Sequence, residues 1–181
     1  MNYVISVMHK DRVGIIADVT SAIKQLGGNL EDMSQTVMRG YFTMLLLAAF
    51  PDGTDEATLR SALSAVKDLA DFEIGIVPFE PDANNGVKAD DSEDRYVLTA
   101  SGPDAPGLVA AIAEYLRQKG INIIDLTTQA NQGRYIMMFL VQLQPQTDVG
   151  KLKHSLRIAM SDLGIQTELR HQALFKMTNE I

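Results

Sequence analysis

The hydrophobic pattern predicts six elements in the first 79 residues. Residues 3–8 are β-branched and aromatic, as a short strand is, and residues 42–50 form a second, almost wholly apolar run. Between these runs, apolar residues recur three and four positions apart, which is the spacing of one helical face. The predicted order is strand, helix, strand, strand, helix, strand, with elements at residues 3–8, 15–26, 29–38, 42–50, 55–70 and 72–79.

The same order returns in the second half of the chain. Strands are predicted at residues 96–101, 122–130, 135–143 and 166–174, and helices at 106–119 and 149–163. A shift of about 93 residues superimposes the two halves without a gap, and a fixed repeat of this kind indicates an internal duplication. The shift matches Tyr3 with Tyr96, Asp11 with Asp104, Gly14 with Gly107, Gly27 with Gly120, Asn29 with Asn122 and Asp32 with Asp125.

The element order predicts the fold class. A strand, helix, strand, strand, helix, strand unit is the split βαβ arrangement of the ferredoxin-like folds, an antiparallel sheet with both helices on one face. We therefore expect an α+β protein with two such domains, at residues 1–79 and 96–181. Residues 80–95 are acidic and rich in turn-forming residues, which predicts a linker.

The third strand of each repeat lacks the alternation of a half-exposed strand. Residues 42–50 and 135–141 are apolar at almost every position. A sheet covered by helices on one face only should alternate between apolar and polar residues, so these runs predict that the other face is buried too. We expect the repeats to pack on each other or on a second chain, and we predict a homodimer.

Composition narrows the classes of function. The 181 residues carry a formal charge of −7, which argues against direct nucleic-acid binding, because a nucleic-acid surface needs clustered Lys and Arg. The chain has no Cys, and its three His are too widely spaced to predict a metal site or a metal cofactor. No apolar stretch is long enough to span a membrane, and no signal-like segment opens the sequence. We expect a cytoplasmic protein without a cofactor.

The turn between the first strand and the first helix is the strongest candidate site in each repeat. A helix N-terminus presents unpaired N–H groups, and a nearby glycine lets a carboxylate reach them. In the first repeat, Asp11 is the expected N-cap, Gly14 follows it, and Lys10 and Arg12 add positive charge. In the second repeat, residues 102–107 include Asp104 and Gly107 but no cation. A purely structural role, in which the loop caps the helix and its glycine allows close packing, explains each loop as well as ligand binding does.

Two asparagines form a second candidate set. Asn29 and Asn122 follow the glycines that end the first helix of each repeat and open the next strand. An asparagine at this position either holds the loop through its own backbone or binds the charged groups of a small ligand.

These motifs resemble the ACT domain, a regulatory module that binds amino acids. The resemblance rests on Asp-x-x-Gly after the first strand, a helix that ends in glycine, and Asn at the start of the next strand. Two modules with little else, with Asn-Leu-Glu-Asp at 29–32 and Asn-Ile-Ile-Asp at 122–125, resemble the glycine cleavage system transcriptional repressor family. Many ACT loops read Asp-Arg/Lys-Pro-Gly; here Val13 replaces the proline and Ala105 replaces the cation.

The resemblance implies a site and a function. ACT modules bind an amino acid between neighbouring modules, which points to His9, Asp11, Gly14 and Asn29 in the first repeat and to Asp104, Gly107 and Asn122 in the second. The leading hypothesis is a non-enzymatic regulator that senses a small amino acid, such as glycine or serine, and acts through a protein partner such as a transcription regulator.

Three other hypotheses share the same topology. The first is a ligand-free assembly module. An acylphosphatase-like hydrolase is the second, but it needs an Arg in a glycine-rich phosphate loop, and Arg12 has no equivalent in the second repeat. The third is an RNA-binding module with aromatic stacking platforms, which the acidic charge disfavours.

Overall fold

The computed structural model describes residues 1–65, 69, 71–81, 94–131 and 133–179. The chain divides into two compact units, residues 1–83 and 84–181. Most of the predicted linker at 80–95 lies outside the described residues, as do Val66 and Ala70 of the second predicted helix.

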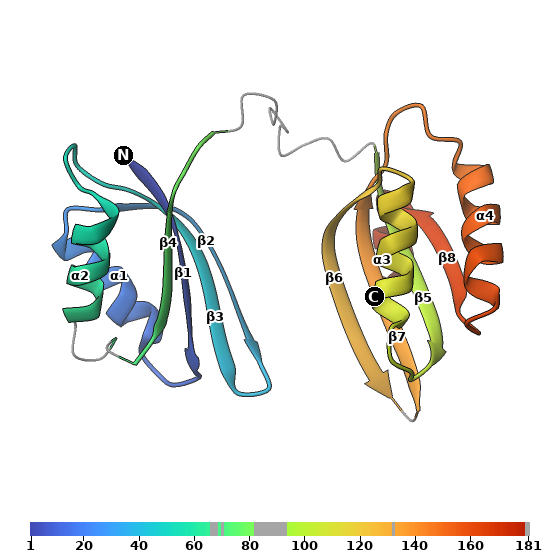
Figure 1. The fold of residues 1–181 in the computed structure, drawn as a ribbon, viewed down its shortest axis with the longest axis horizontal. Coiled ribbons are helices and arrows are strands. Elements are labelled where there is room, and N and C mark those ends of the chain that lie inside the picture. The colour runs from blue at the N-terminus through green and yellow to red at the C-terminus, as the bar shows by residue number, and fades with distance from the viewer. Residues whose placement is uncertain (66–68, 70, 82–93, 132, 180–181) are drawn as a thin grey trace. The chain divides into compact units, whose positions relative to one another are not determined.

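Each unit contains one four-stranded antiparallel sheet with helices packed against it (Figure 1). The strand order is β2-β3-β1-β4 in the first unit and β6-β7-β5-β8 in the second. This arrangement confirms the predicted ferredoxin-like α+β class, present twice. The first unit comprises β1 (Asn2–Lys10), α1 (Ile15–Gln25), β2 (Asn29–Met38), β3 (Tyr41–Ala49), α2 (Glu56–Ala65) and β4 (Glu73–Pro78). The second comprises β5 (Arg95–Pro103), α3 (Leu108–Gln118), β6 (Asn122–Asn131), β7 (Arg134–Gln142), α4 (Val149–Ser161), β8 (Gln166–His171) and α5 (Gln172–Asn179).

The core of each unit lies between the sheet and its two long helices. Along β3, Phe42, Met44 and Leu46 are buried on the helix side, while Tyr41 and Leu45 on the other side are 51% and 52% exposed. Within the first unit, the strand therefore buries one face, although its sequence is apolar on both. Burial of the other face against a second chain stays a prediction.

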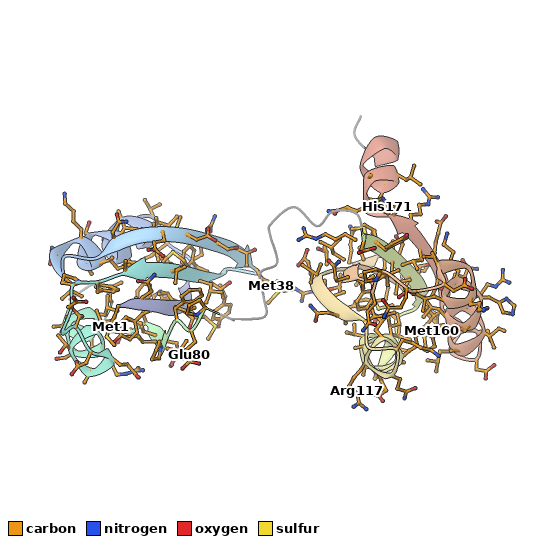
Figure 2. The ribbon with its side chains drawn as sticks, turned by 90° about the horizontal axis from the view of Figure 1, so that it is seen from above. Met1, Met38, Glu80, Arg117, Met160 and His171 are labelled. Atoms are coloured by element: carbon orange, nitrogen blue, oxygen red, sulfur yellow. The ribbon has the colours of Figure 1, made fainter. Side chains whose placement is uncertain are left out.

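The additional helix α5 partly covers the second sheet. It contacts β5 and β8, and Figure 2 shows it leaving the end of β8, near His171, on the side of the sheet away from α3. Val97 of β5 is only 8% exposed although it lies on the sheet face opposite the main core. The open faces of the two sheets are therefore not equivalent.

Three predicted boundaries are wrong, each for a local reason. Asp11 is not an N-cap: its backbone N–H donates to the carbonyl of Gly40, and α1 begins only after Gly14. The helix predicted from residue 106 begins at Leu108, because Gly107 before it adopts a left-handed conformation. The strand predicted to residue 174 ends at His171, whose Nδ1 accepts a hydrogen bond from the N–H of Ala173, and α5 begins at Gln172.

Candidate functional site

The loops that lead from the first strand to the first helix have the same backbone anchor in both units. The N–H of Asp11 donates to the carbonyl of Gly40 at 2.8 Å, and the N–H of Asp104 donates to the carbonyl of Gly133 at 3.0 Å. Each bond ties the loop to the hairpin between the second and third strands. The loop is therefore held at two ends, by this bond and by the helix that follows.

A glycine in the left-handed conformation caps each of these helices. Gly14 has φ 94° and Gly107 has φ 89°, and neither cap includes a side-chain hydrogen bond. A residue with a Cβ is strained at such a φ, so glycine is required by the backbone. Because no side chain caps the first turn, its N–H groups and the positive end of the helix dipole are available to a carboxylate.

A surface pocket adjoins the helix start in each unit. Its volume is about 520 Å³ in the first unit and about 710 Å³ in the second. Both volumes fall in the range of small-molecule sites. Equivalent positions of the repeat line both pockets: Asp11, Gly14, Ile15, Ile16, Ala17 and Phe42 in one, and Asp104, Gly107, Leu108, Val109, Ala110 and Tyr135 in the other.

The cationic side chain of the first loop is engaged within the protein. The guanidinium of Arg12 lies 2.7 Å from the carboxylate of Asp18, and its Cζ lies 5.5 Å from the centre of the Phe72 ring. Arg12 also lines the pocket, but its guanidinium forms an ion pair with the carboxylate of Asp18. The positive charge that the sequence placed at this loop is therefore partly neutralised.

His9 lies beside the loop but outside the pocket lining. Its ring stacks on Phe72, with the ring centres 4.1 Å apart and the planes 6° from parallel. Its Nδ1 is 2.8 Å from the carbonyl of Lys10. These contacts give His9 a packing role in the first unit.

The two asparagines lie at the other end of each sheet. Asn29 pairs with Ala49 at one end of β3, whereas Lys10, next to the loop, pairs with Tyr41 at the other end. At about 3.4 Å per residue, these ends are roughly 27 Å apart. Asn122 pairs with Gln142 at the corresponding end of β7. Within a single unit, neither asparagine reaches the loop pocket.

Phe42 and its counterpart Tyr135 are pocket residues that sequence reasoning did not assign to the ligand site. Gln35 and Val37 of β2 also line the first pocket. The repeat aligns Phe42 with Tyr135, both early in the strand that follows the hairpin, and that aromatic pair was the available signal. The side chains of β2 were not identifiable, because the sequence does not say which strand lies over the helix start.

The described residues contain no cluster of three or more His, Cys, Asp or Glu that could hold a metal ion. In the same part of the chain, no helix has the length and apolar character needed to cross a bilayer.

Comparison with known proteins identifies the family. The sequence pattern of the ACT domain matches residues 2–76 and again residues 94–170, which together are most of the chain. The chain belongs to the ACT domain family. The predicted family resemblance is thereby confirmed, and the chain is a tandem ACT protein of the regulatory class.

Related sequences match one module at a time. A UPF0237 protein of Streptococcus mutans is 38% identical over 76 residues, which are 42% of this chain and 86% of the relative. A UPF0237 protein of Methanopyrus kandleri is 31% identical over 88 residues, which are 48% of this chain and 98% of the relative. Each relative is therefore about as long as one repeat.

Solved structures match almost the whole chain. An unknown protein from Galdieria sulphuraria has a TM-score of 0.72 at 26% identity, with 93% of this chain and 96% of that chain covered. A structure described as "putative glycine cleavage system transcriptional repressor" has a TM-score of 0.69 at 18% identity, with 93% and 95% covered. The second likeness establishes the shared fold alone.

Proposed function

We propose that this tandem ACT protein is a non-enzymatic regulator that binds a small amino acid at the helix-start pocket of each module. The observation that carries the proposal is the recurrence, at equivalent positions of both repeats, of a pocket beside a glycine-capped helix start. The N–H groups of the first turn receive the ligand carboxylate. The resemblance to the glycine cleavage system repressor family suggests a ligand with a small side chain, such as glycine or serine.

Asn29 and Asn122 complete the site from a neighbouring module. Each lies at the end of its sheet far from its own loop, so a ligand that touches both an asparagine and a loop lies between modules. Such a ligand stabilises one arrangement of modules by as much as it binds that arrangement better. The predicted homodimer supplies further module pairs. A cytoplasmic partner, such as a transcription regulator of glycine metabolism, senses the arrangement.

A ligand-free assembly module is the second candidate. Three observations favour it: Asp18 already pairs with Arg12, Val13 replaces the proline of many ACT loops, and Ala105 replaces the cation of the second loop. In this alternative, the two loops serve only to start their helices.

Isothermal titration calorimetry of the full chain against the common amino acids separates the two candidates. We expect at least one small amino acid to bind the wild-type protein. Gly14→Val and Gly107→Val should each weaken that binding, because a side chain at the helix start obstructs the carboxylate. Loss of one charge-assisted hydrogen bond costs about 1.5–3 kcal/mol, or roughly a tenfold to hundredfold loss in affinity. We expect the larger loss for Gly14→Val, since only the first loop carries cationic side chains.

Gly53→Val is the matched control. Gly53 has φ 88°, its Cβ would meet no atom within 4 Å, and it lies in the turn before α2, away from the pocket. Gly53→Val therefore imposes a backbone strain similar to that of Gly107→Val, but its side chain does not contact the pocket. Weakened ligand binding in the loop variants but not in the control supports the proposal. Wild-type protein that binds no amino acid supports the assembly module, and unchanged affinity in both loop variants refutes the loop site.

A further inference from the structure

The last strand of each sheet is an edge strand with a long helix beside it. In the first unit, β4 pairs with β1 on one side and is flanked by α2; in the second unit, β8 pairs with β5 and is flanked by α4 (Figure 1). The registers agree, since Val7 pairs with Ile74 and its counterpart Ala100 pairs with Thr167. The two edges can therefore be compared residue by residue.

The edge of the first unit is closed by its own helix. Arg60 of α2 donates to the carbonyl of Ile74 at 3.1 Å and pairs with Glu56 at 2.9 Å. Pro78 at the end of β4 has no N–H to offer another strand. A covered carbonyl and a proline are both features that prevent an edge from pairing with another strand.

Within the described residues, the edge of the second unit lacks the helix-to-strand hydrogen bond, the ion pair that supports it and the proline. Lys153 stands at the repeat position of Arg60, Val149 at that of Glu56, and His171 at that of Pro78. No hydrogen bond from Lys153 to β8 occurs among the described residues. Because the registers agree, the carbonyl of Thr167 faces outward as that of Ile74 does, and alternation along an antiparallel strand places the backbone of Leu169 on the same side.

A cationic groove lies along this open edge. It has a volume of about 420 Å³ and is lined by α4 and β8. Lys153, His154 and Arg157 line it and are exposed, and none of them forms an ion pair within the described part of the chain. Nitrogen-tipped side chains project from α4 into solvent in Figure 2. Such a cluster is unexpected in a chain with a net charge of −7.

We propose that the β8 edge and the cationic side of α4 form a docking site for an extended acidic peptide of a partner protein. The peptide adds to β8 as a fifth strand, bonding to the outward backbone groups of Thr167 and Leu169. Its carboxylates contact Lys153 and Arg157. This surface is where the protein partner of the proposed function would bind, and to that extent the inference rests on that function. The residues of the surface are different from those of both loop pockets.

The spacing of charges fits an extended peptide. Lys153 and Arg157 are four residues apart on α4, so they are displaced by about 6 Å along the helix axis. Side chains two residues apart on a strand point to the same face and are separated by about 6.6 Å. An alternating acidic peptide therefore presents one carboxylate to each cation. A nucleic acid is disfavoured because Glu168 also lines the groove and the whole chain is acidic.

Fluorescence anisotropy of the full chain with a labelled octapeptide of four Thr-Glu repeats tests the proposal. We expect binding that weakens with salt, and a Thr-Gln peptide should bind at least tenfold more weakly. The double variant Lys153→Gln, Arg157→Gln should also lose at least tenfold. The control Lys24→Gln, Arg39→Gln removes the same charge from exposed positions of the first unit and should stay within twofold of wild type.

Two further peptides test whether the strand edge is used. In one version every threonine is N-methylated, and in the other every glutamate. Each version lacks alternate backbone N–H groups, and a strand pairs with β8 through only one of these two sets, so at least one version should fail to bind. Amide hydrogen exchange at Thr167 and Leu169 should slow when the unmodified peptide is bound. The proposal is overturned if the wild type does not prefer the Glu peptide or if both double variants bind alike. Full binding by both methylated peptides, or equal binding by an eight-nucleotide oligothymidylate, also overturns it.

The proposed amino-acid function has a separate outcome. The Lys153→Gln, Arg157→Gln variant should keep the wild-type affinity for any amino acid found by calorimetry. A failed peptide experiment with intact amino-acid binding overturns the docking site and leaves the loop pockets in place.

Discussion

Gly28, just before β2, tests how tightly the first core is packed. A Cβ at this position would lie 2.5 Å from Cε1 of Phe50 and 2.8 Å from Cγ2 of Ile23. Both side chains are buried and belong to the core, so neither can move away freely. The repeat position of Gly28 is Ile121, which is 6% exposed, and there Leu143 and Leu116 take the places of Phe50 and Ile23.

The backbone at this position is the same in both units. The N–H of Gly28 donates to Ile23 at 2.9 Å, and the N–H of Ile121 donates to Leu116 at 3.0 Å. Since φ of Gly28 is not in the positive region, a side chain is opposed by packing and not by the backbone. The two units thus fill the same space in different ways, with a large ring beside glycine or with two aliphatic side chains.

Gly28→Ala should therefore destabilise the first unit. Overpacking costs about 1–3 kcal/mol, and the reduced freedom of the unfolded chain returns about 0.4–1 kcal/mol. The net loss in the free energy of unfolding should be about 1–2 kcal/mol. Adding Phe50→Leu removes the ring edge that the new methyl group meets, so the double variant should be more stable than the sum of the single changes by about 1 kcal/mol.

Amide hydrogen exchange of the full chain measures this effect within one unit. Amides of β1 and β3 report on the first unit, and those of β5 and β7 serve as an internal control that should not change. The exchange of individual amides assigns the loss of stability to one unit, which a melting temperature of the whole chain does not do. The packing argument is refuted if Gly28→Ala leaves exchange in β1 and β3 unchanged, or if the double variant loses as much as the two single variants together.

Three carboxylates give further predictions. The hydrogen bond from Arg117 lowers the pKa of Glu114 from 4.5 to about 2. The stability that this pair contributes is therefore complete above pH 4.5 and is lost as the pH falls toward 2. Glu114→Gln should flatten this part of a titration of Tm against pH, and an unchanged slope would contradict the pairing. Asp148 accepts a hydrogen bond from the backbone N–H of Lys151 at the start of α4, so Asp148→Ala should lower Tm by a few degrees. Asp11→Ala should lower Tm less than Asp148→Ala does, since the Asp11 side chain caps no helix. Equal decreases in Tm would indicate that Asp11 caps α1 after all.

The repeat made most of the fold predictable. Glycines at 14 and 107, matched by position, fixed the register between the halves, and the strand and helix patterns then had to fit both copies at once. Local patterns failed where the backbone rather than the side chains set the boundary. The start of α1 is decided by the left-handed conformation of Gly14, which is invisible in an apolar pattern. The turn into α5 at His171 was hidden because no glycine or proline marks it: residues 169–174 read Leu-Arg-His-Gln-Ala-Leu.

The candidate site was only partly predictable for a different reason. Asp11 and Gly14 are three residues apart in one loop, so their proximity follows from the sequence. Gln35 and Val37 reach the same pocket through the pairing of β2 with β3, which is a tertiary fact. Likewise, the charge of Arg12 was evident, but its partner Asp18 lies one helical turn into α1, and the sequence does not show the side chain folding back.

Duplication of the loop site has a thermodynamic consequence under the proposed function. Reversing a 1:99 population of two arrangements requires a ligand preference of about 5.5 kcal/mol. The helix start of a module is the same in both arrangements, so the preference at one site comes from the asparagine of the neighbouring module; one hydrogen bond to a charged group contributes about 1.5–3 kcal/mol. Two occupied sites, at Gly14 and Gly107, would together supply about 3–6 kcal/mol, because their contributions add when both favour the same arrangement. One occupied site would therefore produce a partial shift, and two occupied sites would reach the required preference of about 5.5 kcal/mol only at the upper end of this range. Under the two proposals, the second unit would contact the partner through its β8 edge while both loop sites bind the ligand.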